Sequence, residues 1–334
     1  DIAETLRKTV TAFRFSWEGQ VFSVGVSIGL VSITEASGSL DEVLSHADAA
    51  CYAAKDRGRN RVHLFQPDDI QAQERQGQIQ WASRLQEALD KDLFRLYFQT
   101  IVPLENSDNI MPHYEILARM IGPEGEIIPP GAFIPAAERF GLMPKIDQWV
   151  IRNTLSWMGD QLRQNQQPVF CSINLSGASI GREDCLQLIQ EQLEKRKVPA
   201  NNICFEITET AAIADPANAG RFITELKRLG CQFALDDFGS GLSSFGYLKQ
   251  LPVDYLKIDG IFIQELANNR IDQAMVASIN NIGHIMGLKT IAEFVEDAAT
   301  LNILRQIGVD YVQGFYLSRP EPLESLMSVR VMPR

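Results

Sequence analysis

Long hydrophobic runs are missing from this sequence of 334 residues. No apolar stretch approaches the roughly 18 residues that a membrane-spanning helix needs, and no signal peptide opens the chain, so we expect no membrane segment in it. Cysteine is scarce as well, since the five cysteines are odd in number and form no CxxC pair. We therefore expect buried, reduced thiols in a cytoplasmic protein, or in the cytoplasmic part of a larger, membrane-bound one.

Basic residues are also fewer than acidic ones in this chain. The chain has 31 lysines and arginines against 42 aspartates and glutamates, which gives a formal net charge of −11. This sign argues against a DNA or RNA polymer as the partner, because a protein that coats nucleic acid must neutralise phosphates. An anionic substrate would need local neutralisation, by a few Arg or Lys side chains or by metal ions. Hydrophobic residues make up 45% of the chain, which is enough for a proper core.

The start of the chain differs in pattern from the rest. Residues 22–33 form a β-rich run that contains Gly29, where the side chain must stay small. Ser39 and Glu42 then form a capping box for a helix that Gly58 ends. One strand region and one helix are too little for an independent domain.

A polar, glutamine-rich stretch at residues 66–80 follows, and it leads into a helical pattern. This composition is typical of a solvated linker. We therefore divide the chain into an N-terminal segment at 1–65, a linker helix at 66–83 and a larger domain at 84–334.

The larger domain repeats a short apolar strand followed by an amphipathic helix. Eight such units within its length match the size of an α/β fold of the TIM-barrel, (β/α)8, type. An open, doubly wound sheet is the alternative, but it usually has a Gly-rich fingerprint after its first strand, and none is present. The predicted strands are residues 96–102, 114–120, 169–175, 203–209, 232–237, 255–259, 290–295 and 311–317.

Two of the helices between these strands have clear boundaries. Asp215 and Pro216 begin one that Gly230 ends, and another stops before Gly287. Their predicted inner faces comprise Phe222, Ile223, Leu226 and Leu229 in the first helix, and Ile271, Met275, Val276, Ile279 and Ile282 in the second.

Polar side chains interrupt seven of the eight predicted strands, mostly toward their C-terminal ends. In a (β/α)8 barrel, function lies at those ends. Unpaired buried charges are costly, so independent structural ion pairs in so many strands are a poor explanation. The residues are Glu115, Asn174, Glu206, Glu209, Asp236, Asp237, Lys257, Glu293, Glu296 and Gln313.

This set offers oxygen ligands and contains none of the four histidines. Hard cations such as Mg²⁺ or Mn²⁺ prefer oxygen, whereas zinc usually recruits His or Cys. The adjacent pair Asp236 and Asp237 suits two ions, because one carboxylate can bridge them. Two metal ions stabilise the attacking and leaving oxygens of a phosphoryl transfer, and they would hold a phosphodiester inside an acidic protein.

Several segments together resemble the EAL-domain family of cyclic-di-GMP phosphodiesterases. They are YEILAR, SINLS, FEITET, DDFGSGLSSFGYL, VDYLKIDG, IAEFVE and VQGFYLSRP, and their order and spacing match that family through residues 84–325. The opening segment, with SIGLVSI and ADAACYAAKDRGRNRV, resembles the C-terminal half of a GGDEF diguanylate cyclase domain. No GG[DE]EF sequence occurs in the chain, so cyclase activity is not expected from it.

The resemblance implies a modified TIM barrel whose first strand is antiparallel, and hydrolysis of cyclic-di-GMP to linear pGpG with two Mg²⁺ or Mn²⁺ ions. Ca²⁺ should bind in their place and inhibit, because it prefers longer, looser coordination. The implied metal ligands are Glu115, Asn174, Glu206 and Asp236 for the first ion, with Asp236 bridging to a second ion that Asp237 and Glu293 also hold. Lys257 matches the lysine that positions or polarises the attacking water. Its pKa is subject to two opposed effects, since the ions would lower it and the carboxylates would raise it.

The other implied roles concern substrate and regulation. Arg119 should face the substrate phosphate, and Gln99 can meet a guanine. Gln313 and Glu296 match supporting residues of the site. Glu209 matches the glutamate that steadies the loop at residues 236–244, which in the family links the active site to the interface of an EAL-mediated homodimer.

Three residues depart from the family pattern, and none of them removes a carboxylate. Ile116 replaces Ala in the motif that names the family, and Thr100 replaces Pro after Gln99. Phe294 stands beside Glu293 where Gly is usual, and its bulk could limit substrate access. Two alternatives to the phosphodiesterase remain open. One is a catalytically inactive EAL domain that acts as a cyclic-di-GMP receptor, and the other is a metal-dependent lyase of the enolase type.

Overall fold

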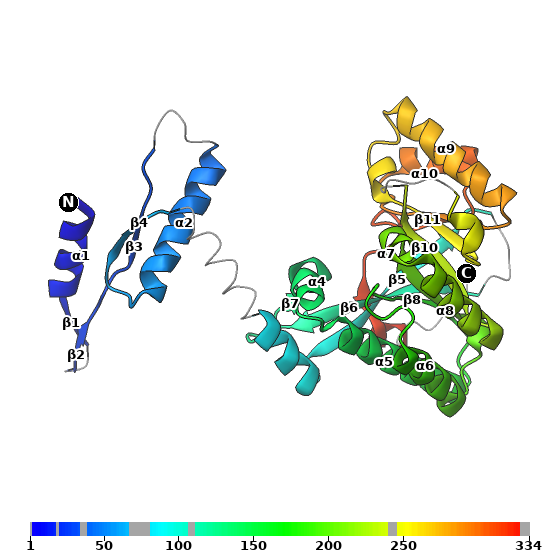
Figure 1. Ribbon diagram of the computed structural model, residues 1–334, viewed down its shortest axis with the longest axis horizontal. Coiled ribbons are helices and arrows are strands. Elements are labelled where there is room, and N and C mark those ends of the chain that lie inside the picture. Colours follow the sequence, from blue (N-terminus) through cyan, green and yellow to red (C-terminus); the bar gives the residue numbers. More distant parts are fainter. Residues whose placement is uncertain are drawn as a thin grey trace. The chain divides into compact units, whose positions relative to one another are not determined.

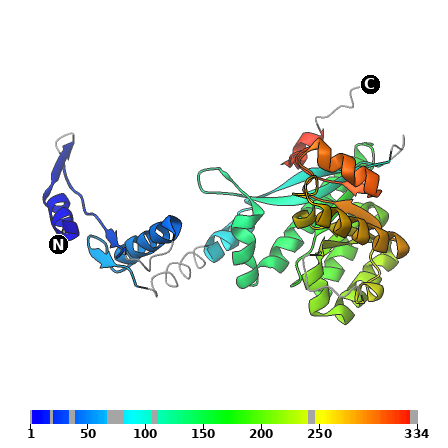
Figure 2. The ribbon, with the colours of Figure 1, turned by 90° about the horizontal axis from the view of Figure 1, so that it is seen from above.

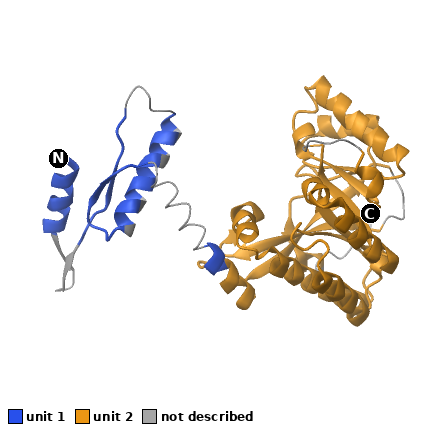
Figure 3. Cartoon of the chain, viewed as in Figure 1, with its two compact units in different colours: residues 1–84 blue, residues 85–334 orange. Residues whose placement is uncertain are grey.

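The computed structural model describes residues 2–17, 20–33, 39–66, 81–105, 111–239 and 246–327. The chain forms two compact units, Asp1–Arg84 and Leu85–Arg334 (Figure 3). The predicted linker at 66–83 lies mostly outside the described residues, and its last three residues are helical. In the described part of the chain, every helix is too short or too polar to cross a bilayer.

The first unit contains a β-hairpin and a separate pair of parallel strands. Strands β1 and β2 pair antiparallel, whereas β3 and β4 pair parallel and are joined by α2. The elements are α1 (Ile2–Ala12), β1 (Arg14–Trp17), β2 (Gln20–Ser23), β3 (Ile28–Leu30), α2 (Leu40–Asp56) and β4 (Val62–Leu64).

Two predictions about this unit are confirmed and one is wrong. Ser39 and Glu42 form the expected capping box at the start of α2. A Cβ atom at Gly29 would lie 2.4 Å from a backbone atom of Cys51, so α2 packs directly on β3 there. The run at 22–33 contains parts of two strands and not one. Its first residues belong to β2, which pairs with β1, whereas Ile28–Leu30 form β3, which pairs with β4.

The second unit is a barrel in which eight of the described strands close a ring, with helices outside them (Figures 1 and 2). Strand β5 runs antiparallel to both of its neighbours, β6 and β13, and the other neighbouring pairs of the ring are parallel. This confirms the modified TIM barrel and excludes the open sheet. The ring consists of β5 (Phe94–Pro103), β6 (His113–Ile121), β8 (Phe170–Asn174), β9 (Ile203–Thr208), β10 (Gln232–Phe238), β11 (Tyr255–Ile258), β12 (Lys289–Ala292) and β13 (Tyr311–Val312).

The remaining elements cover the barrel or extend its edges. Short strands β7 (Ile127–Ile128) and β14 (Glu321–Pro322) pair with β6 and β5. The helices are α4 (Pro130–Arg139), α5 (Met143–Arg163), α6 (Glu183–Arg196), α7 (Glu209–Ala214), α8 (Pro216–Leu229), α9 (Arg270–Ile285) and α10 (Ala298–Ile307), with 3-10 turns η1 (Ala200–Asn202), η2 (Leu248–Gln250), η3 (Gly260–Phe262) and η4 (Leu323–Met327).

The inward side chains of the barrel form an apolar layer with a polar layer above it. The apolar layer contains Cys204, Ala234 and Tyr255 of three adjacent strands, packed with Ile101, Phe170 and Ile291. Side chains alternate between the two faces of a strand, so the residue two positions further on also points inward. Those residues are Glu206, Asp236 and Lys257, which places the polar groups in one layer toward the C-terminal ends of the strands.

The helix predictions are confirmed at the boundaries but only partly on the faces. The side chain of Asp215 caps α8, and Gly230 ends that helix with φ of +105°. Leu229, in contrast, is 40% exposed because it is the last residue of α8. On α9 the buried seam runs through Val276 and Ile279, so Ile271 and Met275 face away from it and are exposed.

Candidate active site

The site is centred on Lys257, whose side chain is fully buried in the polar layer of the barrel. Its Nζ lies 2.6 Å from Glu206 Oε2 and 2.8 Å from Glu293 Oε1. Asp236 Oδ1 is 3.1 Å away and Glu115 Oε2 is 3.8 Å away. Four carboxylates therefore surround one ammonium group, and the excess of negative charge calls for further cations.

The sequence placed Glu293 and Gln313 within strands, and the structure places them just beyond strand ends. Strand β12 ends at Ala292 and β13 at Val312, so both residues lie on the rim of the barrel. Glu209 likewise begins α7 and does not end β9. Glu293 and Gln313 nevertheless line the cavity of the site, whereas Glu209 contacts Gly239 and Tyr247.

Burial and mutual repulsion control the protonation of this cluster. Burial is the main cause that raises the pKa of Glu206 and of Glu293, while the Lys257 ammonium opposes the rise. Burial and the neighbouring Asp236 raise the pKa of Asp237 to about 6. For Lys257, burial would lower the pKa, but Asp236, Glu115, Glu206 and Glu293 outweigh it and raise the pKa well above its usual value. The lysine is thus an ammonium at neutral pH.

The oxygen atoms of the cluster fit divalent cations. Asp236, Asp237 and Glu293 each offer one oxygen, and these three oxygens lie within 4.8 Å of one another. Glu206 Oε1 is buried and has no hydrogen-bond partner, which is costly for an acceptor unless a cation fills its place. Asp236, Asp237 and Glu293 offer carboxylate oxygens with no His or Cys among them, which matches the preference of hard cations.

Amide side chains complete the floor of the site. Asn174 Nδ2 donates to Glu115 Oε1 at 2.6 Å, and Gln313 Nε2 donates to Glu115 Oε2 at 2.6 Å. Gln313 also donates to Gln99 Oε1, while Gln99 donates to the carbonyl of Ser318. Both oxygens of Glu115 are held in place, so its orientation is fixed before any ligand binds.

A cavity of about 280 Å³ opens next to this floor. Seven of the residues singled out in the sequence line it: Gln99, Glu115, Arg119, Glu293, Phe294, Glu296 and Gln313. Arg119 lies over the ring of Tyr97, with 5.3 Å between its guanidinium carbon and the ring centroid. The cavity therefore presents one fixed cation beside the carboxylates, as an anionic phosphodiester substrate would require.

Glu209 contacts described residues on both sides of residues 240–245. It is buried, and its carboxylate accepts hydrogen bonds from the backbone N–H of Gly239 and from the hydroxyl of Tyr247, at 2.9 and 2.6 Å. These two residues bracket residues 240–245, so the predicted loop at 236–244 lies largely outside the described residues. What the structure describes is that Glu209 contacts both sides of that segment.

Sequence reasoning missed one buried carboxylate, that of Asp147. Asp147 of α5 accepts hydrogen bonds from the backbone N–H and the hydroxyl of Ser176 and from the hydroxyl of Ser179, at 3.0, 2.5 and 2.7 Å. Ser176 follows the site residue Asn174 by two positions. An aspartate within the inward, apolar face of a helix, between Ile146 and Val150, was the available signal.

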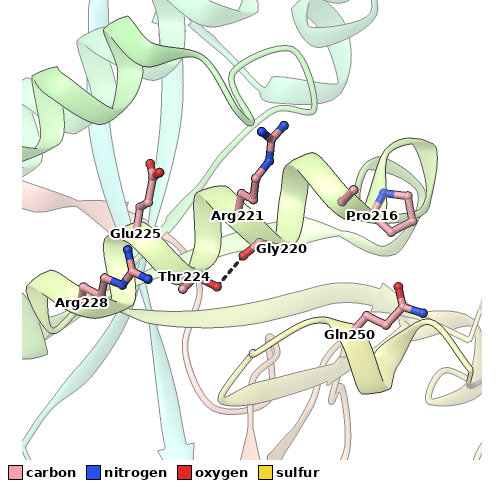
Figure 4. A pocket seen from close by; sticks show the side chains of 8 residues that line it. Pro216, Gly220, Arg221, Thr224, Glu225, Arg228 and Gln250 are labelled. Atoms are coloured by element: carbon pink, nitrogen blue, oxygen red, sulfur yellow. Dashed lines mark hydrogen bonds between the residues drawn. The ribbon is translucent and has the colours of Figure 1, made fainter.

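A different hollow, of about 350 Å³, lies along α8 and η2 (Figure 4). It is lined by Arg221, Arg228 and Gln250 among others, and the hydrogen bond between its residues joins Thr224 to the carbonyl of Gly220 within the helix. None of the site residues predicted from the sequence lines it. The cluster of carboxylates around Lys257 lies in the barrel and not here.

Comparison with known protein families gives two matches. Residues 82–320 match the family model described as EAL domain, and residues 1–61 match the model described as diguanylate cyclase, GGDEF domain. The second match covers the opening segment, which lacks the GG[DE]EF motif.

Two curated proteins illustrate the similarity in sequence. The chain is 42% identical over 306 residues to the cyclic di-GMP phosphodiesterase PdeB of Shewanella oneidensis, covering 91% of this chain and 35% of that protein. It is 32% identical over 318 residues to the cyclic di-GMP phosphodiesterase PdeF of Escherichia coli, covering 93% of this chain and 41% of that protein. The chain thus spans well under half the length of these relatives.

Two solved structures resemble the second unit. One is a complex of the PaMucR phosphodiesterase with c-di-GMP, with a TM-score of 0.69 and 33% identity over 74% of this chain and 99% of that one. The other is the FimX EAL domain from Pseudomonas aeruginosa bound to c-di-GMP, with a TM-score of 0.67 and 33% identity over 72% of this chain and 96% of that one.

Proposed function

The chain belongs to the EAL-domain family, and from this premise we propose that its barrel is a metal-dependent phosphodiesterase that hydrolyses cyclic-di-GMP to linear pGpG. The observation that carries the proposal is the group of four carboxylates around Lys257 at the C-terminal ends of the barrel strands. The relatives named as phosphodiesterases support the same activity.

The proposed cofactors are two Mg²⁺ or Mn²⁺ ions. Glu115, Asn174, Glu206 and Asp236 would hold the first, and Asp236, Asp237 and Glu293 the second. When bound, such ions supply Lewis-acid stabilisation of the phosphate oxygens and a nucleophilic water at neutral pH. The unpartnered Oε1 of Glu206 supports the first set, and the close oxygens of Asp236, Asp237 and Glu293 support the second.

The side chains of the chain itself bind and orient the reactants. In the metal-free site the four carboxylates hold Lys257 as an ammonium, which would donate hydrogen bonds that position the attacking water. Arg119 at the cavity wall pairs with the substrate phosphate. Gln313 holds Glu115 and contacts Gln99, and both glutamines line the cavity and offer amide groups toward a guanine.

The alternative of an inactive receptor is not favoured by this site. An inactive member would be expected to lack one or more of the metal-binding side chains, whereas all the predicted ones are present and converge here. The enolase-type alternative is opposed by the family match and by the adjacent pair Asp236 and Asp237.

Several further assignments belong to this proposal. We take residues 1–65 as the C-terminal part of a GGDEF domain, 66–83 as a linker helix and 84–334 as the phosphodiesterase domain. A homodimer through the EAL barrel fits the exposed side chains of Ile271, Met275 and Ile285 on α9. The free cysteines, of which Cys51 is half-buried and the other four are buried, fit a cytoplasmic location.

The test is incubation of the protein with cyclic-di-GMP and Mg²⁺ or Mn²⁺, followed by chromatography for pGpG. Ca²⁺ should support binding without cleavage, because its longer bonds misplace the attacking water. Adding an excess of Mg²⁺ should then release pGpG. Binding with every ion and pGpG with none would favour the receptor.

A further inference from the structure

Phe294 has a backbone conformation that is unusual for an aromatic residue. Its φ is +52°, in the left-handed region that glycine and asparagine enter more readily than other residues do. The residue follows Glu293 directly, and strained positions of this kind cluster at functional sites. The sequence predicts that the bulk of Phe294 limits the access of the substrate to the site.

The ring of Phe294 is anchored on one side. A Cβ atom at Gly260 would lie 2.3, 2.7 and 2.9 Å from the ring atoms Cδ2, Cγ and Cε2, so the ring rests on the bare backbone of Gly260. Gly260 is buried at the start of η3, a fixed support. Phe294 nevertheless remains 52% exposed and lines the cavity beside Glu293.

The cavity has an apolar part as well as its charged one. Leu117, Phe315 and Pro320 line it together with Phe294. The ring of Phe315 already carries the guanidinium of Arg319, at 4.7 Å from the ring centroid. Phe315 is also half-exposed, so what distinguishes Phe294 is that its ring rests on the backbone of Gly260 and that Arg319 lies over the ring of Phe315.

We propose that Phe294 is a substrate-positioning residue whose ring stacks on one guanine base of cyclic-di-GMP and so favours purine cyclic dinucleotides. This inference rests on the proposed function. A cyclic dinucleotide brings phosphates, which the carboxylate-bound ions and Arg119 neutralise, and flat bases, which need an apolar surface. Phe294 is the neighbour of Glu293, a proposed metal ligand. Stacking of a base on Phe294 would therefore position the phosphodiester of the same dinucleotide relative to the metal site.

The experiment compares wild type with F294N, F294W and F294L. Asparagine tolerates the positive φ and removes the ring, so F294N separates stacking from backbone strain. We expect the Kd for cyclic-di-GMP in Ca²⁺, measured by calorimetry, to rise on the order of tenfold in F294N, the size of one base–aromatic stack. F294W should restore affinity and F294L should not. For cyclic di-UMP the effect should be smaller, because its bases are pyrimidines.

Turnover in Mg²⁺ gives the second readout. Stacking predicts that F294N raises KM more than it lowers kcat, with an unchanged Tm. Tighter binding by F294N would show that the ring obstructs the site, and equal losses for both dinucleotides would show a role in holding Glu293; either result overturns the proposal. If the wild-type protein makes pGpG and F294N binds cyclic-di-GMP with the wild-type Kd, this inference alone is overturned. If the wild-type protein makes no pGpG, the proposed function is overturned.

Discussion

Asp236 carries more of the proposed metal site than any other side chain, because it takes part in both ion sites and also contacts Lys257. Asp236→Ala should lower kcat on the order of a thousandfold or more, and Glu115→Ala nearly as much. Asp236→Ala should also weaken metal binding further, since it removes the bridge. Calorimetry with Mn²⁺ and the pGpG assay measure both effects. Turnover within about tenfold of wild type in either variant would refute the ligand assignment.

Lys257 should act in the chemical step more than in binding. Its ammonium is a preorganised donor, and removing one such donor typically lowers kcat by about a hundredfold to a thousandfold. Lys257→Met should therefore lower kcat strongly with little change in KM. Because the variant leaves the carboxylates without their cation, the assay needs saturating Mg²⁺ and a thermal-unfolding control. A rise in KM with kcat unchanged would assign Lys257 to substrate binding.

At the scale of elements, the segment after β10 depends on the start of α7. Glu209 joins the two through Gly239 and Tyr247. Glu209→Ala should lower activity by roughly tenfold through loss of both hydrogen bonds, although Glu209 is not one of the proposed metal ligands. Tyr247→Phe removes one of the two bonds and should give a smaller loss. Full activity of Glu209→Ala, in a sample shown to be monomeric, would rule out coupling between this segment and a dimer interface.

A second connection between elements joins α5 to the end of β8. Asp147 holds Ser176 and Ser179, so Asp147→Ala should leave three donors without their acceptor, one on buried Ser179 and two on partly buried Ser176. We expect the free energy of unfolding to fall by about 1–3 kcal/mol, as measured with urea. Ser179→Ala removes one donor and serves as the milder control. If Asp147→Ala unfolds at the same urea concentration as wild type, these hydrogen bonds do not stabilise the barrel.

For the whole molecule, the charge at the centre of the barrel predicts how stability depends on pH. The pKa of Asp237 rises on folding from 3.8 to about 6, and those of Glu206 and Glu293 also rise, chiefly through burial. A carboxyl whose pKa is raised on folding binds its proton more tightly in the folded state. Its stabilising effect is present below the unfolded pKa and is lost as the pH rises through the folded pKa.

Without metal, the Tm should therefore fall as the pH rises from about 4 through about 8, since the raised pKa values are about 6 for Asp237 and about 8 for Glu206. Divalent ions bind the deprotonated carboxylates and should reverse the fall, by about 2.7 kcal/mol at 100 times their Kd. Thermal unfolding in EDTA and in Mg²⁺, at about pH 5 and about pH 8, measures this. No effect of Mg²⁺ on the Tm at the higher pH would contradict a metal site in the barrel.

The sequence alone determined where the eight barrel strands lie and most of the polar residues in them, because apolar runs, caps and the side-chain period of two are local properties of the chain. It placed Glu209, Glu293 and Gln313 within strands, and they lie just beyond the strand ends. Asp215 and Gly230 gave the bounds of α8 for the same reason. Local patterns determined less at the edges. The run at 22–33 divided into two strands, because a strand depends on its pairing partner as well as on its own residues.

Only the tertiary structure decided how those residues meet. Closure of the ring brings Glu115 and Glu293, far apart in the sequence, to the same ammonium group of Lys257, and the sum of their charges raises its pKa. The tertiary structure also decided that Met275 of α9 is exposed, because the elements packed against a helix determine which of its sides is buried. It also showed Asp147 under Ser176, and the ring of Phe294 against Gly260. Such contacts depend on distances between segments remote in sequence, and those distances exist only once the barrel has closed.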